Sequence, residues 1–385
     1  MRRTLPLAAM LAATPAHADD LLPAPLPAPR LDADAGADAE APRARPRRPT
    51  GRFELGAGYA PDEGLILHAG VVQVDLFGTG QRLALTTELS ALGHRFHLGH
   101  EVADVLGSGL DLRTELYATR RQHPGFAREA HGGALTVGHR LDRATRVYVR
   151  YRAERVGVAL DDPDAAAAAA ALARGLPAAR TGDGRLAALG AGIAHDTRDD
   201  RLLPRAGTRL ELFAERAAPA LGSEVSLLRL AAAADHARPL GPFTLRLQAR
   251  GAHVRSLDGL PVPLAERLHH GGHRDLRGYP LDALGLVVRD GHRVAAGADS
   301  RLDGRVELEL PVWRAAGLSI AAFADLGVRH NADPGWGPTG ASLHPAVGAS
   351  IIWRSPIGPL RFDWAIPLDG RDRRPAFLFG LGGDF

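Results

Sequence analysis

Residues 301–310 read Arg-Leu-Asp-Gly-Arg-Val-Glu-Leu-Glu-Leu, a stretch in which charged and apolar side chains largely alternate. Successive side chains of a β-strand point to opposite faces, so this stretch predicts a strand with one apolar and one charged face. The same alternation recurs in residues 110–118, 243–250 and 360–368. A soluble β-sandwich would alternate in the same way.

The number of such strands favours a membrane barrel over a sandwich. One soluble core cannot easily bury so many apolar strand faces, whereas a closed barrel turns them to lipid and keeps the charges in its lumen. We therefore predict an all-β protein, a transmembrane antiparallel β-barrel of about sixteen strands over residues 51–385. An even number of strands returns the C-terminus to the side on which the barrel starts.

The connections between these segments also differ in length. Tight turns are expected near residues 77–80, 106–109, 141–144, 239–241 and 355–359, and longer connections at 123–131, 160–184, 256–299, 329–344 and 369–374. Short periplasmic turns that alternate with long outer loops are typical of outer-membrane barrels. The connection 256–299 is the longest of them.

The N-terminus predicts export. Arg2 and Arg3 precede an apolar stretch, and Ala16-His17-Ala18 supplies the small residues of a cleavage site, so residues 1–18 predict a signal peptide. Residues 19–50 are rich in Pro, Ala, Asp and Arg and predict a flexible periplasmic tail. No later stretch supplies the roughly 20 apolar residues of a membrane helix, so a membrane span must be made of strands. The predicted location is the bacterial outer membrane.

The composition argues against several classes of protein. The chain has a formal net charge of +3 and no cysteine, so it can form neither a disulfide nor a thiolate metal site. Its arginines are scattered, without zinc-finger spacing or an aromatic–basic patch, which argues against a nucleic-acid partner. No serine-hydrolase, zinc-protease or phosphate-loop motif is present, so we expect no enzyme activity. His269, His270 and His273 lie close together, but no carboxylate or thiol spacing completes a metal site, and we expect none.

The longest connection carries His-His-Gly-Gly-His-Arg-Asp-Leu-Arg-Gly-Tyr at residues 269–279. Its glycines permit a sharp turn, after which Arg277 is placed to seek a buried anionic partner. Two acids are candidate partners. Because alternate residues of a strand share a face, Glu307 should lie on the charged face of the next strand and Asp325 on the charged face of the strand after it. An arginine held by two carboxylates would pin the loop inside the barrel. A solvated outer loop with an unpaired arginine fits the pattern equally well.

Five stretches resemble motifs of the BamA/TamA surface-antigen superfamily of outer-membrane assembly and secretion barrels. They are Leu276-Arg277-Gly278-Tyr279, His195-Asp196-Thr197-Arg198-Asp199, Glu307-Leu308-Glu309-Leu310-Pro311, Phe323-Ala324-Asp325-Leu326-Gly327 and Ser355-Pro356-Ile357-Gly358-Pro359-Leu360-Arg361, with Phe385 as the expected last residue. The resemblance implies that the outer loop folds inward and that Arg277 reaches Asp325 and Glu307 on the barrel wall. It also implies no catalytic residue and no cofactor.

The first and last strands are expected to meet in a weak seam. The first strand carries Gly56 and Gly58, and the last carries Gly380, Gly382 and Gly383. Glycine inside a strand weakens pairing, and the assembly members of the family use such a seam. The alternative is that these glycines fit a crowded barrel closure.

The last strand is also expected to carry a C-terminal signal. Phe377, Phe379 and the terminal Phe385 lie on one face of it. A terminal strand of this kind can present its edge to the assembly machinery by strand addition. An ordinary amphipathic strand without a signal role is the alternative.

The predicted function follows from the resemblance and from one departure. Family members normally carry periplasmic POTRA domains before the barrel, and the 32 residues of the tail are too few to fold as one. We therefore expect a POTRA-less barrel that assists insertion, assembly or translocation of other outer-membrane or surface proteins through its seam. The expected partners are membrane lipid, unfolded outer-membrane or secreted proteins, and a periplasmic protein in place of the missing domains. The alternative is a protein-secretion pore or a passive diffusion channel.

Overall fold

A computed structural model describes residues 50–60, 63–159, 182–200, 203–272, 274–289, 292–355, 358–369 and 374–381. The predicted signal peptide and all of the predicted tail except its last residue lie outside this part of the chain. Among the described residues, no helix is long and apolar enough to cross a membrane.

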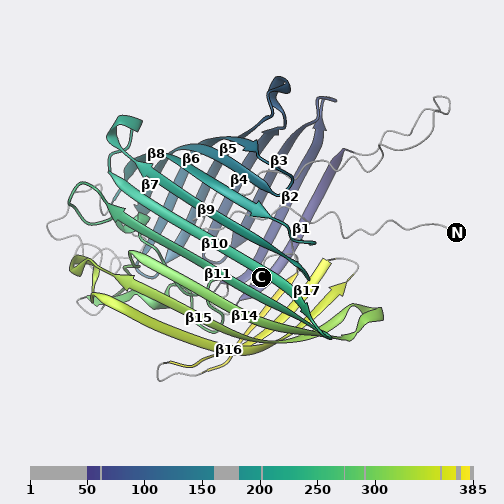
Figure 1. Ribbon diagram of the computed structural model, residues 1–385. Coiled ribbons are helices and arrows are strands. Elements are labelled where there is room, and N and C mark those ends of the chain that lie inside the picture. The colour runs from purple at the N-terminus through teal and green to yellow at the C-terminus, as the bar shows by residue number, and fades with distance from the viewer. Residues whose placement is uncertain are drawn as a thin grey trace, which may run out of the picture.

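Sixteen antiparallel strands close into one barrel (Figure 1). They are β1 (Gly51–Ala60), β2 (Gly64–Leu76), β3 (Gln81–Ser90), β4 (Gly93–Val102), β5 (Leu110–His123), β6 (Phe126–Arg140), β7 (Thr145–Ala159), β8 (Gly184–Asp196), β9 (Gly207–Ala217), β10 (Leu227–Leu240), β11 (Phe243–Ser256), β14 (Ser300–Trp313), β15 (Leu318–Asn331), β16 (Gly340–Ser355), β17 (Gly358–Pro367) and β18 (Ala376–Leu381). Each strand pairs with the next, and β1 pairs with β18 to close the barrel. The predicted fold class and strand number are confirmed.

The burial of side chains is inverted relative to a soluble protein. On β5, for example, Leu116 is 56% exposed whereas its neighbour Glu115 is 4% exposed. On β15, Ile320 is exposed and Asp325 is buried. The alternation in the sequence therefore places apolar side chains on the outer surface, where lipid would cover them, and charged side chains in the lumen.

The connections agree with the predicted lengths only in part. The predicted long connection at 123–131 is wrong, because β5 runs to His123 and β6 begins at Phe126. Gly125 adopts a φ of 90°, which lets two residues reverse the chain while strand pairing continues on both sides. The connections from β1 to β2 and from β3 to β4, at the same end of the barrel, are also short.

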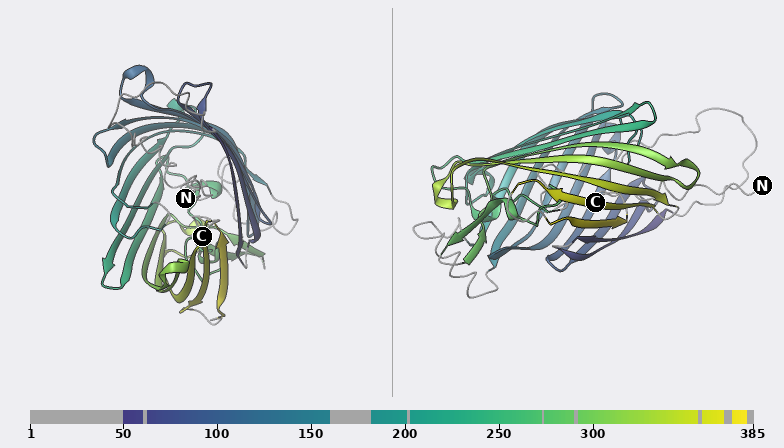
Figure 2. Two further views of the ribbon diagram at one scale, coloured as in Figure 1. Left: turned by 90° about the vertical axis from the view of Figure 1, so that its right-hand side faces the viewer. Right: turned by 90° about the horizontal axis from the view of Figure 1, so that it is seen from below.

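The connection between β11 and β14, residues 257–299, folds into the barrel, and we call it the inner loop. It contains a separate two-stranded sheet of β12 (Leu286–Arg289) and β13 (His292–Ala295). Viewed along the barrel, the loop lies within the ring of strands (Figure 2). Apolar residues of the loop, such as Leu264 and Val294, are buried against Phe126 of β6 and Trp336 of the β15–β16 connection. The predicted inward folding of this loop is confirmed.

Candidate functional site

The tip of the inner loop is a tight turn that carries Arg277. The backbone N–H of Leu276 donates to the carbonyl of Gly272 at 2.9 Å, and that of Gly272 donates to the carbonyl of Tyr279 at 3.1 Å. Gly278 has a φ of 93°, a conformation that favours glycine, and a Cβ there would lie 3.3 Å from the backbone nitrogen of Pro367. The arginine–glycine sequence therefore allows the tip to lie directly against β17.

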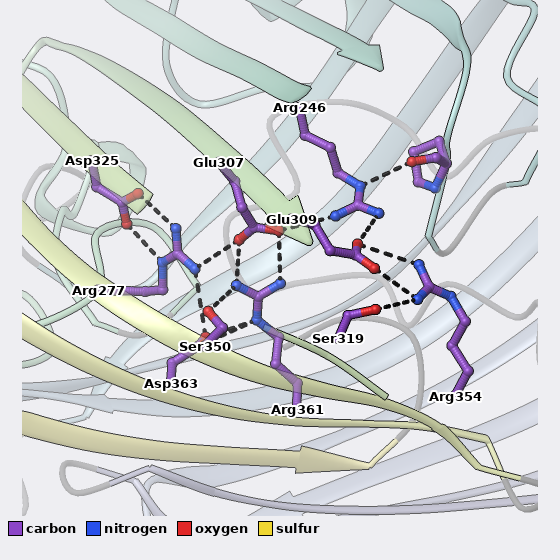
Figure 3. A network of polar contacts seen from close by, with 11 residues as sticks. Arg246, Arg277, Glu307, Glu309, Ser319, Asp325, Ser350, Arg354, Arg361 and Asp363 are labelled. Atoms are coloured by element: carbon purple, nitrogen blue, oxygen red, sulfur yellow. Dashed lines mark hydrogen bonds and ion pairs between the residues drawn. The ribbon is translucent and has the colours of Figure 1, made fainter. Parts of the chain in front are cut away.

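The structure brings Arg277, Asp325 and Glu307 together inside the barrel (Figure 3). The Nε and Nη2 atoms of Arg277 donate to the two carboxylate oxygens of Asp325, each at 2.8 Å, and Nη1 donates to Glu307 at 3.4 Å. The Arg277 side chain is 1% exposed, and its guanidinium carbon lies 3.3 Å from the centre of the Phe323 ring. A planar bidentate contact of this kind fixes the position of the loop tip as well as its charge.

A layer of further charged residues surrounds these three (Figure 3). Glu307 also accepts from Arg361, at 2.5 and 3.3 Å, and from Arg246 at 3.1 Å. Asp363 accepts from Arg361 at 2.8 Å and lies 3.6 Å from Arg277. Each buried charge in this Arg277 network thus has an opposite charge beside it, as burial requires. Sequence reasoning missed Arg361, Arg246 and Asp363, although all three lie on the charged faces of segments whose alternation is plain.

Tyr279 extends the contact to the strands beyond. Its hydroxyl lies within hydrogen-bond distance of two acceptors, the backbone carbonyl of Pro345 at 2.7 Å and the carboxylate of Asp369. Its ring meets the ring of His344 edge to face, with centroids 5.8 Å apart. The motif residues Arg277, Gly278 and Tyr279 therefore contact β14, β15, β16 and β17 and the start of the connection after β17.

The structure describes part of the seam between β1 and β18. In that part Ala57 pairs with Leu381, Gly58 with Gly380 and Tyr59 with Phe379. Gly382, Gly383 and Phe385 lie outside the described residues. A Cβ at Gly56 would meet its nearest atoms at 3.5 Å, an ordinary contact distance, so crowding does not require glycine there.

Residues 75–385 match the family model of the Omp85 superfamily domain. The chain belongs to the Omp85 superfamily. Barrels of this superfamily are outer-membrane proteins of assembly and secretion, not enzymes. The resemblance that the sequence motifs indicated is confirmed at the level of the family.

Individual relatives of this Omp85 chain are distant. It is 25% identical over 346 residues to the outer membrane protein assembly factor BamA of Nitratidesulfovibrio vulgaris, covering 87% of the chain and 42% of that protein. It is 26% identical over 382 residues to the factor of the same name from Neisseria meningitidis, covering 88% of the chain and 47% of that protein. The chain thus spans less than half the length of these curated relatives.

Solved structures share the fold of this Omp85 barrel. BamA from Haemophilus ducreyi lacking POTRA domains 1–3 superposes with a TM-score of 0.72 at 18% identity, over 88% of this chain and 71% of that one. CdiB from Acinetobacter baumannii superposes with a TM-score of 0.58 at 14% identity, over 87% of this chain and 60% of that one. At these identities the likeness concerns the fold alone.

Further anchors attach the inner loop of this Omp85 barrel to the other walls of the lumen. Glu266 of the loop accepts from Arg229 of β10 at 2.6 Å and from Arg128 of β6 at 3.1 Å. Arg274 donates to Glu88 of β3, with both bonds at 3.3 Å. Sequence reasoning found none of these pairs, because an irregular loop has no periodicity from which to infer partners.

Two of the three histidines singled out in the sequence lie within the described residues, and they make different contacts. The imidazole of His270 is hydrogen-bonded to Asp303 of β14, whereas His269 lies against His123 at the end of β5. His273 lies outside the described residues. His269 and His270 therefore face different walls of the barrel.

Proposed function

We propose that this Omp85 barrel assists the insertion or assembly of other outer-membrane proteins through the seam between β1 and β18. The observation that carries the proposal is the pairing of Gly58 with Gly380 at the centre of the described part of the seam, because glycine inside a strand weakens pairing. A weakly paired seam can release backbone N–H and C=O groups for the strand of a client protein to engage. The clients would be unfolded outer-membrane or surface proteins.

The inner loop has a supporting role in this proposal. Its tip is held by Arg277, Asp325 and Glu307, and buried ion pairs of this geometry favour one arrangement over others. We infer that these residues, with Gly278 and Tyr279, act as a lock that keeps the loop in the lumen while the seam works. Phe385 would serve the barrel's own assembly, and a periplasmic partner would deliver clients.

Transport is the second candidate function. The superfamily comprises secretion barrels as well as assembly barrels, so a protein-secretion pore is also consistent with this fold. A passive diffusion channel is less compatible, because the inner loop occupies the lumen and is anchored to several walls. Single-channel recording separates the two functions: a steady open pore favours transport, and a closed barrel favours insertion.

The test uses the absence of cysteine from the chain. Gly58→Cys and Gly380→Cys introduce a pair across the seam, because these residues are register partners. The matched control is Gly58→Cys with Ile66→Cys, which are register partners between β1 and β2. Both proteins are reconstituted in liposomes, and the folding rate of an unfolded barrel substrate is measured in the oxidised and reduced states.

The proposal expects a clear pattern in these rates. Reduced seam protein accelerates folding of the substrate, and oxidation abolishes the acceleration, whereas the control pair accelerates in both states. If neither protein accelerates folding when reduced, or if oxidation of the seam has no effect, insertion through the seam is wrong.

A further inference from the structure

A second polar cluster lies beside β5, on the side of the barrel opposite β15 and the Arg277 network. His123 stands at the outer end of β5, and His269 and Asp282 belong to the inner loop. The three side chains come from separate segments of the sequence, and the residues are 5%, 5% and 4% exposed. Three buried ligating groups that converge from distant positions suggest a common partner.

The geometry of the cluster suits one small ion. Nδ1 of His123 lies 2.7 Å from a carboxylate oxygen of Asp282, and the ring centroids of His123 and His269 are 4.3 Å apart. One ligand atom from each residue can be chosen so that all three lie within 4.8 Å of one another. Ligand atoms around a tetrahedral Zn²⁺ are about 3.4 Å apart, so side-chain shifts on the order of 1 Å are needed, and the hydrogen bond between His123 and Asp282 opens as both groups turn to the ion.

Asp282 supplies a carboxylate oxygen to the cluster, and a carboxylate is a ligand that divalent cations accept. The nearby Arg121 is itself paired with Glu63 at 3.2 Å, which offsets its positive charge. A cavity of about 170 Å³ inside the barrel is lined by His123 and His269.

We propose that His123, His269 and Asp282 bind a divalent transition metal such as Zn²⁺. Two imidazoles and one carboxylate form a ligand set that such ions prefer, with a fourth position left for water. His269 and Asp282 lie on either side of the turn that carries Arg277. The metal therefore clamps the base of the loop tip to β5, while Arg277 holds the tip to the opposite wall.

The test is a metal titration of the untagged, refolded barrel in detergent after dialysis against a chelator. Zn²⁺ is added in competition with a chromophoric chelator, and Co²⁺ is added to follow visible absorption by a tetrahedral site. We expect one equivalent of Zn²⁺ to bind with a dissociation constant of about 10 µM or below. The temperature at which the barrel loses its folded electrophoretic mobility should rise on Zn²⁺ binding.

Variants identify the ligands. His269→Gln leaves the contact between His123 and Asp282 intact, and its affinity for Zn²⁺ should fall at least tenfold while the barrel remains folded. Asp282→Asn should weaken binding similarly, and it should abolish the tetrahedral Co²⁺ spectrum. His139→Gln, at the other end of the barrel, is the control and should bind like the original protein. Absence of saturable one-equivalent binding, or equal affinity in the original protein and His269→Gln, would overturn the proposal.

Discussion

Replacing Arg277 by alanine tests whether the loop tip is locked energetically as well as geometrically. The change removes two 2.8 Å hydrogen bonds to Asp325 and the contact with the Phe323 ring. Removal of one partner of a buried ion pair typically costs about 3–5 kcal/mol, because it leaves an uncompensated charge. Here Asp325 keeps Arg305 at 3.3 Å, so the expected loss of unfolding free energy is smaller, about 2–3 kcal/mol.

The measurement is urea unfolding of the refolded barrel in lipid vesicles, followed by tryptophan fluorescence. A double-mutant cycle with Asp325→Asn should give a coupling energy of at least about 1 kcal/mol, because both single changes break the same contact. Arg277→Lys should recover part of the loss, since lysine keeps the charge without the planar fork.

The control for this prediction is another lumen arginine. Arg82 pairs with Glu101 at 3.1 Å, but its side chain is 26% exposed. Arg82→Ala should therefore cost only about 0–1 kcal/mol. Equal losses in Arg277→Ala and Arg82→Ala, or a coupling energy near zero in the cycle with Asp325→Asn, would refute the reasoning.

Two further predictions concern the support of the inner loop. Gly348→Ala should destabilise the barrel by about 1–3 kcal/mol in the same urea assay. Its Cβ would lie 2.2 Å from the backbone oxygen of Trp364 and 2.3 Å from the Phe323 ring, which underlies the loop arginine. Burial raises the pKa of Glu266, but Arg229, Arg128 and Arg152 outweigh it and lower the pKa to about 2. The stability from this carboxylate should be present above about pH 4.3 and lost as the pH falls towards 2. Thermal unfolding at a series of pH values should show this loss in the original protein, and Glu266→Gln should lack it.

The barrel could be predicted from the sequence because its periodicity has a single cause. Successive strand residues face lipid and lumen in turn, so parity alone places Glu307 and Asp325 on the lumen face, where the structure has them. Parity does not give the register between strands. That Arg246 is the register partner of Glu307 became visible only in the structure.

The interior of the barrel was harder to predict. The anchors at Glu266 and the contact of His123 with Asp282 join strand residues to an irregular loop, which carries no repeating signal. The wrong prediction of a long connection at residues 123–131 has a different cause, the ambiguity of a proline–glycine pair. Proline followed by glycine marks the start of a loop, but it marks a two-residue turn equally well.

The arrangement of the inner-loop anchors determines what opening of the seam would break. These side-chain contacts attach the inner loop to β3, β5, β6, β10 and to β14 through β17, whereas β1 and β18 meet through backbone pairing. Separation of β1 from β18 therefore breaks none of these anchors. A barrel built in this way can yield at one edge while the rest of its wall stays braced through the lumen. The Arg277 contact and the seam should then act independently. Weakening the Arg277 contact should lower the unfolding free energy of the barrel, and activity should still require an open seam.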